Sequence, residues 1–120
     1  MRASRGELKI VEILASAGLN FKEEYSFSDL RVGKGTLLRF DFAIFDDEDE
    51  ELQFLIEYQG IQHYVPKSKF GGTSALYKQR YNDKMKVDYC KKHHIKLLVI
   101  PYTDYEIMNY DYIAIRGGLV

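Results

Sequence analysis

The chain has 120 residues, of which 46% are hydrophobic, and its formal net charge is −1. These values exclude a disordered chain and predict a single domain over 1–120 with a core of its own. One cysteine excludes an internal disulfide and fits a reducing compartment. No apolar run reaches the roughly 20 residues that cross a bilayer, so we expect a cytoplasmic protein without membrane contact.

The first half of the chain carries one helical pattern and three strand patterns. Apolar residues recur at helical spacing over 5–17, after Ser4 as a candidate N-cap. Alternating apolar patterns then predict strands at 21–27, 37–45 and 52–58. A glycine turn at 33–35 separates the first two strands, and an acidic hairpin loop separates the second from the third.

The strand over 37–45, LLRFDFAIF, predicts two unlike faces. Because side chains alternate along a strand, one face is expected to hold Arg39, Asp41 and Ala43. The other is expected to be apolar, with Leu38, Phe40, Phe42 and Ile44.

The second half predicts a loop, a long helix and a buried strand. The loop covers 65–74 and the helix 75–93, and the strand KLLVIP covers 96–101. Plausible inward positions of the long helix are Leu76, Tyr81, Met85, Tyr89 and Cys90. Asp104 is expected to cap a short last helix ending at Ile107. The order helix, strand, strand, strand, helix, strand predicts a mixed α/β core with one sheet flanked by helices.

Charge is distributed unevenly along this nearly neutral chain. Six consecutive acids occupy 46–51, and without them the net charge would be +5. Nine Lys or Arg and only two acids lie between 66 and 97. Such a one-sided basic patch would suit a nucleic acid, although solvated lysines on exposed helix faces explain it equally well.

Two acids, Asp41 and Glu57, interrupt otherwise apolar strands. If the strands pair through the acidic hairpin, both carboxylates can lie near one end of the sheet. Two carboxylates and a backbone carbonyl are the oxygen ligands that Mg²⁺ or Mn²⁺ prefers. The alternative is that each acid points to solvent from a one-sided sheet.

Four further polar residues complete the candidate site. His63 follows the third strand and has a side chain suited to a general base, with Asp83 on the next helix as a candidate orienting partner. Gln59 could orient a water or a phosphate, or simply bond a neighbouring strand. Glu7 has two equally weighted interpretations: a water-holding role at the metal, or a capping box with Ser4.

These residues, in this order, resemble the PD-(D/E)XK nuclease superfamily. The more specific similarity is to its EDxHD branch, which includes very-short-patch mismatch repair endonucleases and phage homing endonucleases. The branch motif corresponds here to Glu7, Asp41, Glu57, His63 and Asp83, and the similarity covers about 4–102. Gln59, in Glu57-x-Gln59, takes the place of the lysine in the Glu-x-Lys motif of other superfamily members.

The resemblance implies a restriction-endonuclease-like core and a Mg²⁺- or Mn²⁺-dependent endonuclease of homing or repair type, from a phage or mobile element. It would hydrolyse DNA to leave 5′-phosphate ends. Asp41 would be the main metal ligand, and Glu57 would add a carboxylate or carbonyl oxygen. His63, oriented by Asp83, would be the general base, unless the replacement of lysine by Gln59 reassigns that role. The zinc-binding cysteines and aromatic wedges of the mismatch repair enzymes are absent, so mismatch recognition is not implied.

The expected partner is DNA, and a chain of this size is compatible with a homodimer. Its expected DNA contacts are Lys67, Lys69 and Phe70 in the loop and Lys78, Arg80, Lys84 and Lys86 on the long helix. Phe70 could stack on a base or wedge a base step, or it could instead pack down as an anchor of the loop. Two alternatives stay open. One is a structure-selective resolvase of four-way junctions, and the other is a catalytically inactive DNA-binding domain of the same fold.

Overall fold

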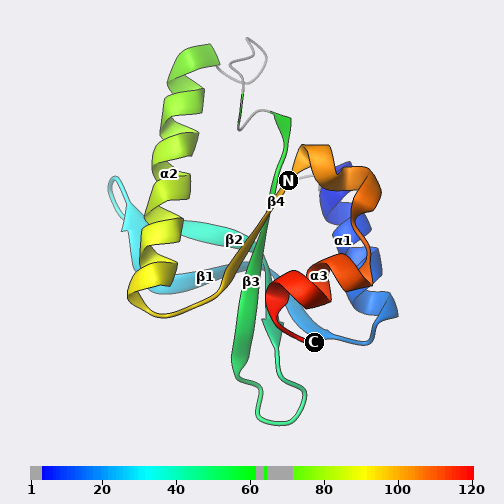
Figure 1. Ribbon diagram of the computed structural model, residues 1–120. Helices are drawn as coiled ribbons and strands as arrows, with labels where there is room; N and C mark the ends of the chain where they lie inside the picture. Colours follow the sequence, from blue (N-terminus) through cyan, green and yellow to red (C-terminus); the bar gives the residue numbers. More distant parts are fainter. Residues whose placement is uncertain (1–3, 62–63, 65–71) are drawn as a thin grey trace.

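The computed structural model describes residues 4–61, 64 and 72–120 (Figure 1). Its elements are α1 (Arg5–Ser16), β1 (Asn20–Val32), β2 (Thr36–Phe45), β3 (Leu52–Gln59), α2 (Gly72–Lys92), β4 (Leu97–Pro101), the 3₁₀ helix η3 (Tyr102–Ile107) and α3 (Tyr110–Gly117). The expected mixed α/β fold and its order of helices and strands are confirmed. No helix in the described ranges is long and apolar enough to cross a membrane.

One four-stranded sheet, in the order β1-β2-β3-β4, forms the centre of the fold. The first three strands are antiparallel neighbours, whereas β3 and β4 are parallel. Parallel neighbours need a crossover connection, and α2 lies within it. Figure 1 shows α2 on one side of the sheet and α1, η3 and α3 on the other.

Each face of the sheet has its own hydrophobic cluster. Ile10 and Leu14 of α1 pack with Phe54, Ile56 and other buried side chains on the first face. On the opposite face, Cys90 of α2 packs with buried side chains of β1, β2 and β3. The sheet is therefore covered by helices on both faces.

The side chains of β2 do not alternate regularly between the two faces of the sheet, because the alternation reverses at Asp41. The expected simple alternation is therefore wrong. Leu38 and Phe40 belong to the cluster on the α2 side, whereas Phe42 and Ile44 belong to the other cluster. Ala43, expected beside the polar residues, is fully buried on the α2 side. The neighbouring strand is irregular at the same level, because Glu24, between the paired residues Glu23 and Tyr25, has a φ of 50°.

Several element boundaries differ from the expected ones. Strand β1 continues five residues past 27, through a register shift between Ser26 and Arg31, before the glycine turn that was expected at 33–35. Helix α2 begins at Gly72, so the last part of the expected loop is helical, and 65–71 lie outside the described residues. Tyr81, expected to point inward, is 58% exposed, while Leu76 and Cys90 are buried as expected.

The C-terminal segment contains a helix that the sequence analysis did not predict. Asn109 caps α3 by accepting a hydrogen bond from the Tyr112 amide at 2.8 Å, and Gly118 ends the helix in the left-handed conformation. Asp104 does not cap the preceding helix; its carboxylate accepts a hydrogen bond from the Tyr112 hydroxyl at 2.7 Å. Asp104 therefore joins η3 to α3.

Candidate functional site

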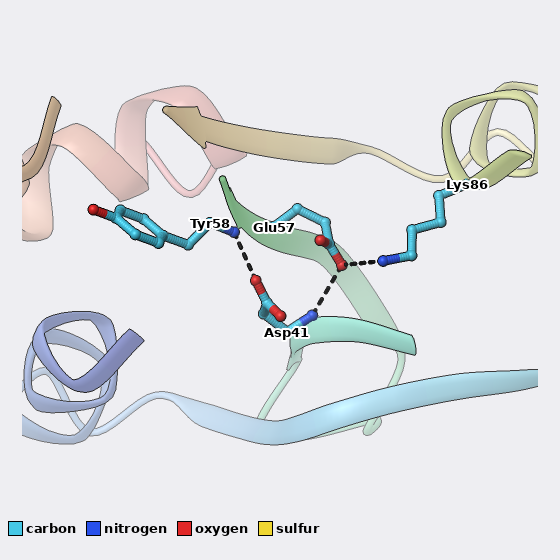
Figure 2. A network of polar contacts seen from close by, with 4 residues as sticks. All are labelled: Asp41, Glu57, Tyr58 and Lys86. Carbon is cyan, nitrogen blue, oxygen red and sulfur yellow. Dashed lines mark hydrogen bonds and ion pairs between the residues drawn. The ribbon is translucent and has the colours of Figure 1, made fainter. Parts of the chain in front are cut away.

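Asp41 and Glu57 lie together where strands β2 and β3 stop pairing. The last paired residues before this point are Phe42 and Ile56. Beyond them, the Asp41 amide donates to Glu57 Oε1 at 3.1 Å, and Asp41 Oδ2 accepts from the Tyr58 amide at 2.7 Å (Figure 2). Each carboxylate thus bonds the backbone of the neighbouring strand. The expectation that the two acids meet on adjacent strands is confirmed.

Lys86 of α2 completes this group of charges. Its ammonium lies 3.1 Å from Glu57 Oε1, and the side chains of Lys86 and Glu57 are only 14% and 8% exposed. Figure 2 shows Lys86 and Asp41 approaching the Glu57 carboxylate from different directions. We expected Lys86 among the surface contacts to DNA, but it lies instead beside the buried Glu57. We call Asp41, Glu57 and Lys86 the carboxylate–lysine cluster.

Burial has the largest effect on the pKa of Glu57 in this cluster. It raises the pKa of Glu57 to about 8, and the negative charge of Asp41 acts in the same direction. The ammonium of Lys86 opposes both effects and only partly offsets them. Burial and the charge of Glu57 also raise the pKa of the nearby Cys90 thiol to about 11, so this cysteine is a neutral thiol at pH 7.

Gln59, at the end of β3, belongs to a second polar group. Its side-chain oxygen accepts a hydrogen bond from the Tyr64 hydroxyl at 2.8 Å, and the Tyr64 carbonyl accepts one from Arg80 at 3.3 Å. Burial raises the pKa of Tyr64, and so does the negative charge of Asp83. Asp83 is therefore close enough to Tyr64 for its charge to act on that phenol. His63, like Lys67, Lys69 and Phe70, lies outside the described residues.

Glu7 forms the capping box that was one of its two expected roles. The Glu7 amide donates to Ser4 Oγ at 3.2 Å, and Glu7 Oε1 accepts from the Ser4 amide at 3.5 Å. The same carboxylate lies close enough to Tyr58 to raise the pKa of that phenol, after the larger effects of burial and of Tyr105. Glu7 thus faces the strand that carries Glu57, but its hydrogen bonds are those of a helix cap.

The remaining expected DNA contacts on α2 lie on its surface. Lys78, Arg80 and Lys84 are exposed, and Lys84 pairs with Asp88 at 2.6 Å. The sequence analysis missed the position of Lys86. A usable signal was present, because Lys86 stands four residues before the inward-facing Cys90 and therefore on the same side of the helix. The tyrosines at 58 and 64 were missed because nothing in their spacing separates them from core aromatics.

Within the described ranges, no three His, Cys, Asp or Glu side chains are grouped so that they could hold a metal ion. The candidate ligands are therefore the two carboxylates of the cluster. Such a pair is a partial ligand set, since Mg²⁺ sites in proteins often use one or two carboxylates and fill the other positions with water and substrate phosphate.

Part of the chain is similar to a known viral protein. The chain is 43% identical over 67 residues to "Uncharacterized protein 094L" of Frog virus 3 (isolate Goorha). The match covers 54% of this chain and 43% of that protein, so the chain spans less than half of its relative. No family model and no solved structure matches the chain.

Proposed function

We propose that the chain is a DNA endonuclease dependent on Mg²⁺ or Mn²⁺, with its reaction centre at the carboxylate–lysine cluster. One observation carries the proposal: the buried Glu57 carboxylate, the half-buried Asp41 carboxylate and a lysine meet at an interruption of the central sheet. Charged side chains are rarely buried in a protein, because removing them from water is costly. Acids whose pKa is raised as strongly as that of Glu57 are often found at functional sites.

The cluster fits a hard divalent cation. Asp41 and Glu57 would hold the ion through oxygen ligands, the type that Mg²⁺ and Mn²⁺ prefer. Their mutual repulsion, which helps to raise the pKa of Glu57, is the electrostatic strain that a bound cation would relieve. When bound, the ion would stabilise negative charge on the scissile phosphate and acidify a water.

Lys86 supplies a positive charge that the strand motif lacks. In the Glu-x-Lys arrangement the lysine follows the glutamate by two residues, but Gln59 stands there in this chain. We assign that role to Lys86, whose ammonium reaches Glu57 from α2. Its ammonium would partly offset the effects that favour the protonated form of Glu57, and it would lie beside the phosphate being cleaved.

The proton transfer would involve His63 and Asp83. In the hydrolysis, a water oxygen bonds to phosphorus, the bond from phosphorus to the 3′-oxygen breaks, and His63 takes the proton of the attacking water. The products are a 5′-phosphate and a 3′-hydroxyl, the latter formed by protonation of the leaving oxygen. Asp83, whose charge acts on the Tyr64 phenol, is the residue to which we assign the orientation of this histidine.

Cleavage of supercoiled plasmid and of a labelled four-way junction, each with Mg²⁺, Mn²⁺ or EDTA, tests the proposal. Asp41→Asn and His63→Ala should abolish metal-dependent cutting and leave DNA binding nearly unchanged. Asp88→Asn, which removes one exposed acid from α2, is the matched control and should cut normally. If Asp41→Asn cuts as fast as the unaltered chain, the reaction centre lies elsewhere.

The hydrogen bonds of the two acids favour one competing function. Asp41 and Glu57 both accept backbone amides, so they could serve only to close the gap between β2 and β3 in a DNA-binding domain without activity. Such a domain would bind DNA, cut neither substrate, and gain no thermal stability from Mn²⁺. A chain that sediments as a dimer and cuts the four-way junction faster than the plasmid would instead be a structure-selective resolvase.

A further inference from the structure

A concave site outside the carboxylate–lysine cluster lies at the carboxyl ends of the parallel strands β3 and β4. It is a cleft of about 410 Å³, lined by Arg5, Tyr58, Tyr102, Thr103, Tyr105 and Glu106. We call it the tyrosine cleft. Its volume falls within the range of about 300–1,000 Å³ that is typical of small-ligand sites. Ligands of open α/β sheets commonly bind at this end of the strands.

The walls of the cleft combine aromatic rings with an exposed guanidinium. Arg5 lies over the Tyr105 ring, 4.1 Å from its centroid, and Lys9 lies over the same ring at 4.5 Å. Lys9 also donates a hydrogen bond to the Tyr105 carbonyl, which holds that residue in place. The side chain of Arg5 is 76% exposed, and its ion pair with Glu106, at 3.5 Å, is exposed as well. Such a pair contributes little stability, so Glu106 would compete only weakly with an incoming anion for Arg5.

Two contacts connect the tyrosine cleft to the candidate reaction centre. Tyr58, which lines the cleft, donates its amide to the Asp41 carboxylate. The Tyr102 ring lies 5.5 Å from the ring of Tyr64, whose hydroxyl bonds Gln59 at the end of β3. A ligand in the cleft would therefore lie on the α1 and η3 side of the sheet, next to the Tyr58 backbone that bonds Asp41, whereas Lys86 reaches the cluster from the α2 side.

We propose that the tyrosine cleft binds an unpaired base of a DNA strand, with Arg5 directed to the neighbouring phosphate. This inference rests on the proposed nuclease function and narrows its substrate to DNA with a single-stranded part, such as a tail or a flap. A paired base is stacked between its neighbours and cannot enter a cleft of this size. Tyrosine rings stack on any base, and arginine binds phosphate, so the site would be tolerant of sequence.

Binding in EDTA tests the proposal independently of cutting. Fluorescence anisotropy would compare a labelled 20-nucleotide single strand, a blunt duplex, and a duplex with a single-stranded tail. The unaltered chain should bind the strand and the tailed duplex more tightly than the blunt duplex. Tyr102→Ala should weaken the first two roughly 5- to 100-fold and the blunt duplex less than about twofold, because stacking on one aromatic ring accounts for such a difference.

Two further variants separate stacking from folding. Tyr102→Phe keeps the ring and should bind as the unaltered chain does. Tyr110→Ala removes a tyrosine of similar exposure, 39% against 36% for Tyr102, from outside the cleft and should also bind normally. Equal affinity of the unaltered chain for single strand and blunt duplex would overturn the proposal, as would normal single-strand binding by Tyr102→Ala.

A spectroscopic measurement on the unaltered chain remains decisive if Tyr102→Ala does not fold. The chain contains no tryptophan, so 2-aminopurine placed in the tail can be observed without interference. Its fluorescence should be quenched on binding when it lies in the tail and not when it lies within the duplex. Absence of quenching at every tail position would overturn the proposal. The nuclease function would stand or fall separately, on the loss of cutting in Asp41→Asn.

Discussion

Glu57 is the residue in which burial and charge conflict most strongly. Its pKa is raised from an ordinary 4.5 to about 8 by burial and by Asp41. Between these two pH values the folded chain keeps the Glu57 proton that the unfolded chain has lost. The stability contributed by this proton is thus fully present below about pH 4.5 and decreases until about pH 8.

We therefore predict that the unfolding free energy, measured with urea in EDTA, decreases from pH 4.5 to pH 8 relative to that of Glu57→Gln. The glutamine cannot titrate, so the difference between the two proteins isolates this residue. A difference that stays constant over this pH range would contradict the prediction and show that Lys86 keeps Glu57 ionised throughout.

Lys86 gives a second prediction at the residue scale. Lys86→Met leaves the Glu57 carboxylate without its ammonium partner, and breaking such a buried pair costs about 3–5 kcal/mol. Protonation of Glu57 would relieve this cost, so urea unfolding should show a larger loss at pH 8.5 than at pH 5. The control is Lys84→Met on the same helix, whose pair with Asp88 is exposed and should contribute less than about 1 kcal/mol. Equal losses in the two variants would show that the Lys86 pair is no stronger than a surface pair.

At the scale of the elements, hydrophobic period and turn residues were enough to predict the sheet and its two longest helices. The failures have local causes. The alternation rule assumes an unbroken ladder, and in β2 the ladder is interrupted at Asp41, so Phe40 and Phe42 face opposite clusters. Helix α3 was missed although Asn109 and Gly118 are ordinary cap residues, because its apolar pattern is only eight residues long.

The candidate site was predictable only in part for a similar reason. Strand pattern was enough to bring Asp41 and Glu57 together, because adjacent strands joined by a hairpin must align. Long-range packing was not readable from the sequence. The spacing of Lys86 and Cys90 indicates only the side of α2 on which Lys86 lies. Its approach to Glu57 depends on how α2 crosses the sheet, and the approach of Tyr102 to Tyr64 depends on where β4 ends.

The contact between α1 and β3 supports a prediction about this packing. Gly6 lies against the Tyr58 ring, and an added Cβ would come within 2.1 Å of a ring atom. Gly6→Ala should gain up to about 1 kcal/mol in helix propensity but lose about 1–3 kcal/mol to overpacking, so thermal unfolding should show a net loss. Ser16→Ala, at an exposed position of the same helix, should be neutral or slightly stabilising. A stabilised Gly6→Ala would mean that Tyr58 moves aside freely.

At the scale of the whole molecule, the acidic hairpin at 46–51 lies apart from the carboxylate–lysine cluster and from the lysines of α2. Strand β3 begins directly after the acidic hairpin and ends at Gln59. Glu57 is five residues from the start of the strand, roughly 17 Å at the usual rise per residue. The Debye length is about 8 Å at physiological salt, so the six acids scarcely oppose a phosphate at the carboxylate–lysine cluster. The near-zero net charge is therefore compatible with DNA binding on the side of α2.

This separation predicts which lysines determine the salt dependence of DNA binding. If Lys78, exposed on α2, contacts a phosphate, Lys78→Ala should reduce the slope of log affinity against log salt by about 0.9 on duplex DNA. Lys96→Ala makes the same change of charge at an exposed residue just before β4, at the opposite end of the parallel strands from Gln59. Its slope should equal that of the unaltered chain. The measurement is anisotropy with duplex DNA at 50–200 mM salt in EDTA. Equal reductions by both variants would mean that affinity follows net charge alone, and α2 would then lose its assignment as the DNA-binding surface.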